Sequence, residues 1–429
     1  MPGARNWAMV LLATGAAERV LFLLTTARHD VAGGEAANVA AAIARGEGVA
    51  DVFGKGSGPT AHLNPVVPAI AGTVYRLFGL RTFMGEAALS LIAITCVLAA
   101  AALFHRASLW AGASRRAALA ALAVFCLVPL NNYLEIVDFR VWEGGLATLL
   151  GAATLLLTVR ADAAAKVSWR VVWGIAILAA LTFFISPPLG LAAYVNALLL
   201  LVRRVPARRW ATTAAVAVVA LLAVLTPWTI RNYQAFGRVI PLRGNFGLEL
   251  ALANHPAAMR TDDELGVFRE RLNAIHPQMS WSAFHAMQRQ GGELGYADAL
   301  GAEAKAWIGA HPADFARLSL RHLAQFYFPP AWQWSIYGGV STGQRIKLLL
   351  SWLIAAAGLV GAAAALVAWR GRLIYIATLA LLPVLPYAIV QPIPRYRYLV
   401  YLPLLRLAAE LTARFLDRLG VARLERGTA

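Results

Sequence analysis

Residues 203–233 read RRVPARRWATTAAVAVVALLAVLTPWTIRNY, with no charged side chain between Arg209 and Arg231. About 20 consecutive apolar residues are enough for a helix to cross the hydrocarbon core of a bilayer. Basic residues precede this run, and Trp228 follows it. Tryptophan is enriched at membrane–water interfaces, where a spanning helix leaves the lipid. The stretch therefore predicts a transmembrane helix over 211–227.

The composition extends this prediction to the whole chain. Of its 429 residues, 59% are hydrophobic and only 14% are charged, and the mean hydropathy is +0.61. Soluble domains carry charge on about a quarter of their residues, so a soluble enzyme is excluded. We expect an all-α polytopic membrane protein with about ten spans, near 7–26, 87–104, 117–131, 144–159, 171–188, 189–202, 211–227, 346–368, 373–392 and 398–415.

The positive charge indicates how the chain lies in the membrane. The formal net charge is +17, but the arginines gather in short connections such as Arg115-Arg116 and Arg203-Arg204, so nucleic-acid binding is not expected. Connections rich in arginine face the cytoplasm. Both termini are then cytoplasmic. Residues 63–80 are also apolar, but counting them as a span would place Arg115-Arg116 outside the cytoplasm. We therefore expect a re-entrant or interfacial segment.

Three parts follow from this topology. Residues 1–227 form an N-terminal transmembrane module whose first outer loop is 27–86. Residues 228–345 are more polar and contain amphipathic helical patches, which predicts a small, mostly helical extracytoplasmic domain. Residues 346–429 form the C-terminal transmembrane helices and a cytoplasmic tail. We expect the functional site on the outer side.

The first outer loop carries two candidate catalytic acids, Glu35 and Asp30. A carboxylate that is partly desolvated at the lipid boundary can act as a general base toward a hydroxyl group. The alternative for Glu35 is an acid that favours the start of a helix without any catalytic role.

The second outer loop, 132–143, holds further acids beside a cation. Asp138 and Glu143 are candidate catalytic residues, because an acid at the mouth of a membrane helix is costly unless it is paired or used. If the segment is helical, Glu135 and Asp138 share a face. Arg140 is a candidate phosphate ligand, and the alternative is a solvated ion-pair cluster around it.

Several basic or amide side chains at the outer interface are candidate ligands for a phosphate. Arginine suits this role because its planar fork makes two hydrogen bonds to phosphate oxygens. The alternative is that the arginines extend to lipid headgroups beside ordinary interfacial aromatic residues. The candidates are Arg231, Asn232, Arg395, Arg397 and, where the first loop returns to the membrane, His62, which is otherwise a turn residue.

No metal site is predicted from the sequence. His255, His276, His285 and His311 have no ligand-like spacing, so we expect surface or packing positions for them. Cys96 and Cys126 each lie inside an apolar run, which indicates neither a disulfide nor a zinc site.

The order of several short motifs resembles a known family. These motifs are Arg45-Gly-Glu-Gly48, Gly58-Pro-Thr-Ala61, Tyr75-Arg-Leu-Phe-Gly79, Thr226-Pro-Trp-Thr-Ile-Arg-Asn-Tyr233, Asn245-Phe-Gly-Leu-Glu249 and Pro394-Arg-Tyr-Arg-Tyr398. In this order, and placed outside the membrane, they resemble the bacterial glycosyltransferases of the GT-C superfold. That group is related to the protein O-mannosyltransferases of glycosyltransferase family 39 and to the lipid A aminoarabinose transferase.

The resemblance implies an enzyme that moves a hexose or pentose from a polyprenyl-phosphate carrier to a lipid, glycan or protein acceptor, without a nucleotide. It implies Glu35, or Asp30, as the acid of the first loop and Glu143, or Asp138, as the later acid, with arginines that hold the phosphate. Some relatives bind a divalent ion, which leaves such a cofactor open. The alternatives are a flippase or transporter of lipid-linked glycans, and a glycan ligase or polymerase.

Overall fold

The computed structural model describes residues 4–335, 342–368 and 371–419. Every element in these ranges is a helix, and the β pairing among them is limited to one isolated bridge between Ala50 and Pro59. The all-α class is therefore confirmed. Residues 336–341 of the predicted extracytoplasmic domain and the predicted cytoplasmic tail beyond residue 419 lie outside the described residues.

Among the described residues, five helices are long and apolar enough to cross a membrane. A sixth span results if α5 (Arg115–Leu127) and the following segment Asn132–Arg140, bent by 75° against it, are counted together. The five lie in α1 (Ala4–Thr25), α4 (Phe83–Trp110), α7 (Gly144–Ala163), α10 (Trp210–Phe236, preceded by the short helix η2, Ala207–Arg209) and α17 (Thr342–Val367).

The other predicted spans fall on helices that are shorter, broken or more polar, so a total of ten stays a prediction. The predicted span 373–392 is broken at Leu382, where a 3₁₀ segment with Pro383 and Pro386 begins, since proline has no N–H for the α-helical hydrogen bond. These helices are α5, α8 (Trp169–Ile185), α9 (Pro187–Arg204), α18 (Ile374–Leu381) with η4 (Leu382–Ala388), and α19 (Pro394–Arg418).

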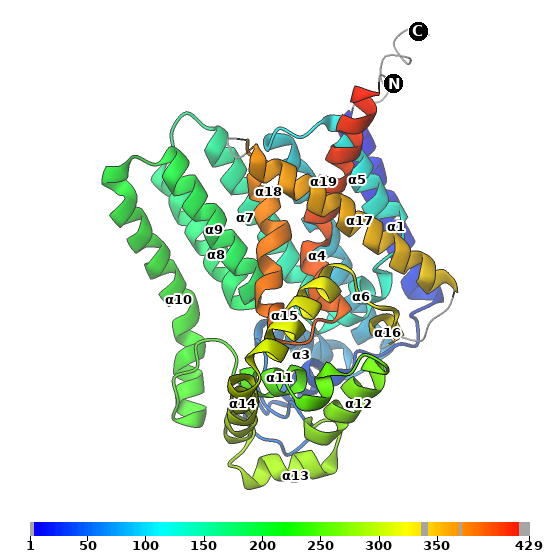
Figure 1. Cartoon of the computed structure of the whole chain (residues 1–429), viewed down its shortest axis with the longest axis vertical. Coiled ribbons are helices and arrows are strands. Elements are labelled where there is room, and N and C mark those ends of the chain that lie inside the picture. Colours follow the sequence, from blue (N-terminus) through cyan, green and yellow to red (C-terminus); the bar gives the residue numbers. More distant parts are fainter. Residues whose placement is uncertain (1–3, 336–341, 369–370, 420–429) are drawn as a thin grey trace.

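A second group of helices gathers at one end of this bundle (Figure 1). At the opposite end lie the start of α1, the end of α19 and the arginine-bearing connections such as that between α4 and α5. The gathered helices are α2 (Gly34–Arg45), α3 (Val66–Phe78), α6 (Asn132–Ile136), η1 (Asp138–Arg140), α11 (Phe246–Ala253), η3 (Pro256–Met259), α12 (Glu264–Ile275), α13 (Trp281–Arg289), α14 (Glu293–Ala310), α15 (Pro312–Tyr327) and α16 (Ala331–Ser335).

Helix α3 lies within residues 63–80, whose re-entrant or interfacial position stays a prediction. It has 13 residues, which is too short to cross the hydrocarbon core, and it packs against α2 instead. A Cβ added at Gly72 of α3 would lie 2.8 Å from the carbonyl oxygen of Ala40, so the two helices approach closely because residue 72 has no side chain.

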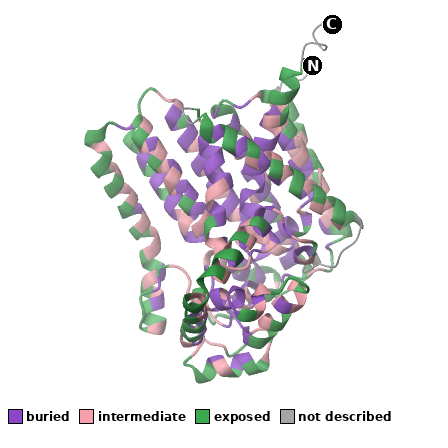
Figure 2. Cartoon of the chain, viewed as in Figure 1, coloured by how far each residue is buried: buried purple, intermediate pink, exposed green. Residues whose placement is uncertain are grey.

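Buried side chains fill the interior of the bundle, whereas α10 and the outer face of α17 are largely exposed (Figure 2). Small residues allow a close crossing between α17 and α19. A Cβ added at Gly358 or Gly361 would lie 2.6 Å from the backbone oxygen of Leu404 or Leu407, respectively. Such small-residue contacts are a common way for membrane helices to associate.

Two charged pairs lie inside the bundle. Arg19 of α1 contacts Glu135 at 2.6 Å, and Tyr398 of α19 donates to the same carboxylate at 2.8 Å. Arg140 contacts Glu86 of α4 at 2.8 Å. Each arginine is about 2% exposed, so these pairs lie between the helices inside the bundle and do not form a solvated cluster on the outside.

Candidate functional site

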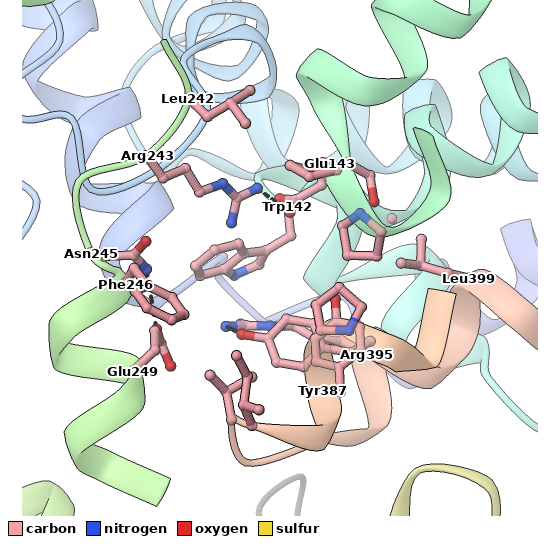
Figure 3. A pocket seen from close by; sticks show the side chains of 18 of the residues that line it. Trp142, Glu143, Leu242, Arg243, Asn245, Phe246, Glu249, Tyr387, Arg395 and Leu399 are labelled. Atoms are coloured by element: carbon pink, nitrogen blue, oxygen red, sulfur yellow. Dashed lines mark hydrogen bonds and ion pairs between the residues drawn. The ribbon is translucent and has the colours of Figure 1, made fainter. Parts of the chain in front are cut away.

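A cavity of about 290 Å³ lies where the bundle meets the helices gathered at its end (Figure 3). Its walls come from five parts of the chain: the turn before α7, the turn between α8 and α9, the segment that leads into α11, the segment η4, and the start of α19. Proline at the starts of α9 and α19 is favoured because the first helical N–H groups have no partner within the helix. The cavity thus joins segments that are distant in the sequence.

An ion pair crosses this cavity. Glu143 precedes the first residue of α7, and its carboxylate accepts a hydrogen bond from Arg243 at 2.5 Å (Figure 3). Burial alone would raise the pKa of Glu143, but the charge and hydrogen bond of Arg243 lower it below its ordinary value, with a smaller contribution from Arg395. Glu143 is therefore ionised at neutral pH and able to accept a proton.

Aromatic rings and a second cation form the facing wall. The guanidinium of Arg395 lies over the ring of Trp142 at 3.7 Å from its centroid, and the rings of Tyr387 and Tyr396 are stacked at 4.7 Å. Glu249 of α11 also lines the cavity. The site therefore combines two carboxylates and two arginines with apolar surfaces, at the boundary between apolar and polar parts of the molecule.

A second cluster joins the first loop to the segment after α12. Glu35, in the first turn of α2, accepts from His62 at 3.2 Å and from His276 at 2.9 Å, and Phe53 packs edge-on against both imidazoles. Burial would raise the pKa of Glu35, but the charge of His62 and the two hydrogen bonds hold it well below its ordinary value. One carboxylate oxygen of Glu35 and one ring nitrogen of each histidine lie within 4.8 Å of one another, so the three residues could hold a metal ion.

This cluster borders the cavity. A Cβ added at Gly34 would lie 3.9 Å from the ring of Trp142, which lines the cavity, and Glu35 is the next residue. Burial lowers the pKa of His62, but Glu35 raises it above its ordinary value, with smaller contributions from Glu293 and Glu249. Glu249 also lines the cavity. The acids and histidines therefore belong to one electrostatic environment.

Two of the predicted phosphate ligands hold the first loop instead of lining the cavity. Arg231 donates to the backbone oxygens of Thr60 at 2.7 Å and Val49 at 2.5 Å. Asn232 is buried, accepts from Arg231 and donates to the backbone oxygen of Ile240. Both fix the loop that carries His62, and neither is placed among the cavity residues.

Three other candidates lie away from the cavity. Arg140 donates to the backbone oxygen of Asp30 at 2.6 Å and so anchors the start of the first loop. Arg397, 8% exposed, donates to the backbone oxygen of Ser351 on α17. The structure thus gives Arg140, Asp30 and Arg397 contacts inside the protein, and a role for any of them toward substrate stays a prediction.

Asp138 lies next to the residues of the cavity but does not line it. It starts η1, directly before the cavity residue Phe139, and it interacts electrostatically with Arg395 and Glu143. The conditional expectation that Glu135 and Asp138 share a helical face is not met, because α6 ends at Ile136.

Sequence reasoning missed two residues of the site. His276 was expected at a surface or packing position, but it is 5% exposed and contacts Glu35. No spacing predicts this contact, since the fold alone brings the two residues together. Arg243 was not considered, although it lies two residues before the motif Asn245–Glu249 and is an outer arginine of the kind that singled out Arg231.

No protein-family model matches the chain, and no curated protein matches it either. Among solved structures, it resembles the archaeal oligosaccharyltransferase AglB from Archaeoglobus fulgidus. The match to AglB in complex with an inhibitory peptide and a dolichol-phosphate has a TM-score of 0.54 and 15% identity, and covers 99% of this chain and 52% of that chain. The match to the apo form has a TM-score of 0.56 and 15% identity, and covers 99% of this chain and 52% of that chain.

A third AglB structure, a complex with Zn and sulfate, matches with a TM-score of 0.53 and 14% identity over 96% of this chain and 49% of that chain. ArnT from Cupriavidus metallidurans bound to undecaprenyl phosphate matches with a TM-score of 0.39 and 16% identity over 95% of this chain and 78% of that chain. The chain therefore has the GT-C fold expected from its sequence, and it spans about half the length of the oligosaccharyltransferase chains that it matches.

Proposed function

We propose that this chain transfers a sugar from a polyprenyl-phosphate-linked donor to a lipid, glycan or protein acceptor at the outer face of the cytoplasmic membrane. The observation that carries the proposal is the cavity, where Glu143, Arg243 and Arg395 meet aromatic rings at the boundary between the apolar bundle and its polar end. A lipid-linked sugar phosphate has the same division into an apolar chain and a charged head. The GT-C fold supports this assignment.

In the proposed reaction, an acceptor hydroxyl attacks the anomeric carbon of the donor. The bond from that carbon to the phosphate oxygen breaks, polyprenyl phosphate leaves with the electron pair, and the acceptor proton moves to a carboxylate. Glu143 is the proposed base because its lowered pKa keeps it ionised and because it lines the cavity, whereas both imidazoles already engage Glu35. Arg395 would stabilise the departing phosphate.

The proposal includes an orientation. The helices α11–α16 would lie outside the cytoplasm, as the extracytoplasmic domain 228–345, and cover the cavity from that side. The arginine-bearing connections at the opposite end of the bundle would face the cytoplasm together with both termini. This arrangement supports access to a donor in the outer leaflet.

We also propose Glu35, His62 and His276 as a site for a divalent transition-metal ion. One carboxylate and two imidazoles suit zinc, whereas magnesium prefers oxygen ligands. Such an ion would supply positive charge close to the donor phosphate. Metal content after dialysis tests this directly: the wild type should retain about one ion per chain and His276→Asn should lose it. If the wild type and His276→Asn both contain almost no metal, the three residues form only a hydrogen-bonded cluster.

Transfer of label from polyprenyl-phosphate hexoses and pentoses to a membrane extract, with the protein in nanodiscs, tests the activity. The wild type should transfer label from at least one donor, and Glu143→Gln should lower the rate by about 10²- to 10⁴-fold. Glu47→Gln is the matched control, since Glu47 is an exposed acid of the first loop paired with Arg45. Absence of transfer from every donor would overturn the proposal in favour of a flippase.

A glycan ligase or polymerase is the second candidate, because the fold resembles part of the oligosaccharyltransferase AglB. The same assay separates the two when donors that carry one sugar are compared with donors that carry an oligosaccharide. Preference for the longer donor would favour the ligase.

A further inference from the structure

The cavity has a side that the proposed reaction does not use. Asn245 directly precedes α11, Glu249 lies in its first turn, and both side chains line the cavity. Figure 3 shows them on the α11 side, away from the ion pair of Glu143 and Arg243. The role of this side therefore depends on what the two side chains can bind.

Together the two side chains present hydrogen-bond acceptors to the cavity. Within the described residues, the side chain of Glu249 accepts one hydrogen bond, from the amide nitrogen of Asn245 at 3.2 Å, and forms no ion pair. Because a carboxylate only accepts, the amide nitrogen must face Glu249, and the amide oxygen of Asn245 is directed elsewhere. No described residue donates to that oxygen. Two acceptors on one helical turn thus remain for a ligand that donates hydrogen bonds.

The other charged side chains of the cavity are engaged. Arg243 donates to Glu143 at 2.5 Å, and the guanidinium of Arg395 lies over the ring of Trp142. Among the described residues, Glu249 is therefore the charged group of the cavity that no cation neutralises by direct contact. A carboxylate on the wall of a largely apolar cavity is costly unless a partner satisfies it, which points to a ligand at this position.

The packing of α11 holds these acceptors in place. A Cβ added at Gly247 would collide with the backbone oxygen of Ala297 on α14, so the two helices are in close contact. The backbone N–H of Gly244 donates to the backbone oxygen of Ala61 at 2.8 Å, which joins the start of α11 to the first loop. Binding groups that a rigid element supports can discriminate between similar ligands.

We propose that Asn245 and Glu249 bind two hydroxyl groups of the donor sugar and thereby determine which sugar is accepted. Side chains at i and i+4 lie side by side on a helix, which suits neighbouring hydroxyls. The negative charge of Glu249 favours a neutral sugar over a uronic acid, whose carboxylate it would repel. This inference rests on the proposed function and adds the substrate class: a neutral hexose or pentose, held between Arg395 and α11.

A panel of polyprenyl-phosphate donors tests the inference, with the full chain in nanodiscs. The panel contains a neutral sugar, its monodeoxy analogues and the corresponding uronic acid. Loss of a hydroxyl that binds Glu249 should lower kcat/KM of the wild type by about tenfold to a hundredfold, because hydrogen bonds to charged groups are stronger than neutral ones. The uronic acid should react at least about tenfold more slowly than the neutral sugar.

Glu249→Gln should change the ratios between donors. The monodeoxy analogue that the wild type disfavours should lose little further, since the variant has already lost the same contact, and the uronic acid should be disfavoured less. Asn245→Ala should change the ratios for a neighbouring hydroxyl. Each ratio compares donors on one variant, so it does not depend on how much of the protein is folded.

Glu270→Gln is the matched control, because Glu270 is an exposed acid of α12 and its loss should leave every ratio as in the wild type. Identical ratios in Glu249→Gln and the wild type would overturn the inference, as expected for an acid that only favours the start of α11. A changed KM for the acceptor with unchanged donor ratios would overturn it as well.

Binding without turnover separates this inference from the proposed function. Equilibrium binding of the same labelled donors is measured for Glu143→Gln and for Glu143→Gln/Glu249→Gln. Discrimination between donors that depends on Glu249, together with no transfer by the wild type, would overturn the proposed function alone. Transfer by the wild type with discrimination that does not depend on Glu249 would overturn this inference alone. If no donor binds, both are wrong.

Discussion

Glu143 and Arg243 form the ion pair of the cavity. The sequence predicts Glu143, because an acid at the start of an apolar run is unusual and visible. It does not predict the partner, since Arg243 lies in a different segment and only the fold brings the two together at 2.5 Å. The same holds for the cluster at the first loop, where Glu35 and His62 are predicted individually and His276 is not.

Replacing Arg243 should change the pH dependence of transfer. Arg243 lowers the pKa of Glu143 below its ordinary value near 4.5, so the wild-type rate should persist at neutral pH and fall only as the pH drops through that lowered pKa. In Arg243→Gln, burial raises the pKa of Glu143 with less opposition, so the acid limb of kcat/KM should move to higher pH. An unchanged acid limb with a lowered rate would assign Arg243 to substrate binding alone.

At the scale of elements, the first loop depends on two anchors outside it. Arg231 at the end of α10 and Glu293 at the start of α14 both bind residues 49–61, and Glu293 accepts from Thr60 at 2.6 Å and from the backbone N–H of Ala61 at 2.5 Å. The sequence indicates the loop and its helices, but its pattern predicts a phosphate ligand at Arg231, whereas the structure shows hydrogen bonds from Arg231 to the loop backbone. Long-range hydrogen bonds to backbone oxygens have no sequence signal.

Glu293→Ala should loosen this loop. The substitution leaves the Thr60 hydroxyl and the Ala61 N–H without their acceptor, which costs about 1–3 kcal/mol. Amide hydrogen exchange over residues 49–62 should rise by roughly tenfold to a hundredfold, with little change in α4 or α7. Asp298→Asn serves as the control, because Asp298 is exposed and pairs only at the surface with Arg238. Equal exchange in both variants would contradict the anchoring role.

Helices α17 and α19 also allow a sharp test. Gly358→Ala should lower the thermal unfolding midpoint in detergent, since the new Cβ would lie 2.6 Å from the backbone oxygen of Leu404 and force the helices apart. Gly309→Ala on α14 should not lower it, because nothing lies within 4 Å of a Cβ there and alanine favours a helix. If the two variants melt alike, the close crossing does not contribute to stability.

At the scale of the whole molecule, the periodic and compositional signals are strong enough to predict an all-helical membrane protein. They do not predict how α11–α16 gather at one end of the bundle, whereas the break of the predicted span 373–392 into α18 and η4 falls at prolines that the sequence shows. Composition reports which residues prefer lipid, whereas the arrangement of polar helices depends on contacts between distant segments.

Topology reporters fused after residues 113, 165 and 206 should all report the cytoplasmic side, because these connections carry arginines and lie at one end of the bundle. A fusion after residue 290, in the connection between α13 and α14, should report the opposite side. A cytoplasmic signal at residue 290 would place the cavity at the wrong face for an outer-leaflet donor.

The most direct test of the central claim is the stoichiometry of a single turnover. Purified protein in nanodiscs is mixed with a donor that is labelled separately in its sugar and in its polyprenyl phosphate, and a membrane extract supplies the acceptor. The account predicts one polyprenyl phosphate released for each sugar transferred, with both products lost in Glu143→Gln and retained in Glu47→Gln. Release of neither product, or equal turnover in Glu143→Gln and the wild type, would contradict it.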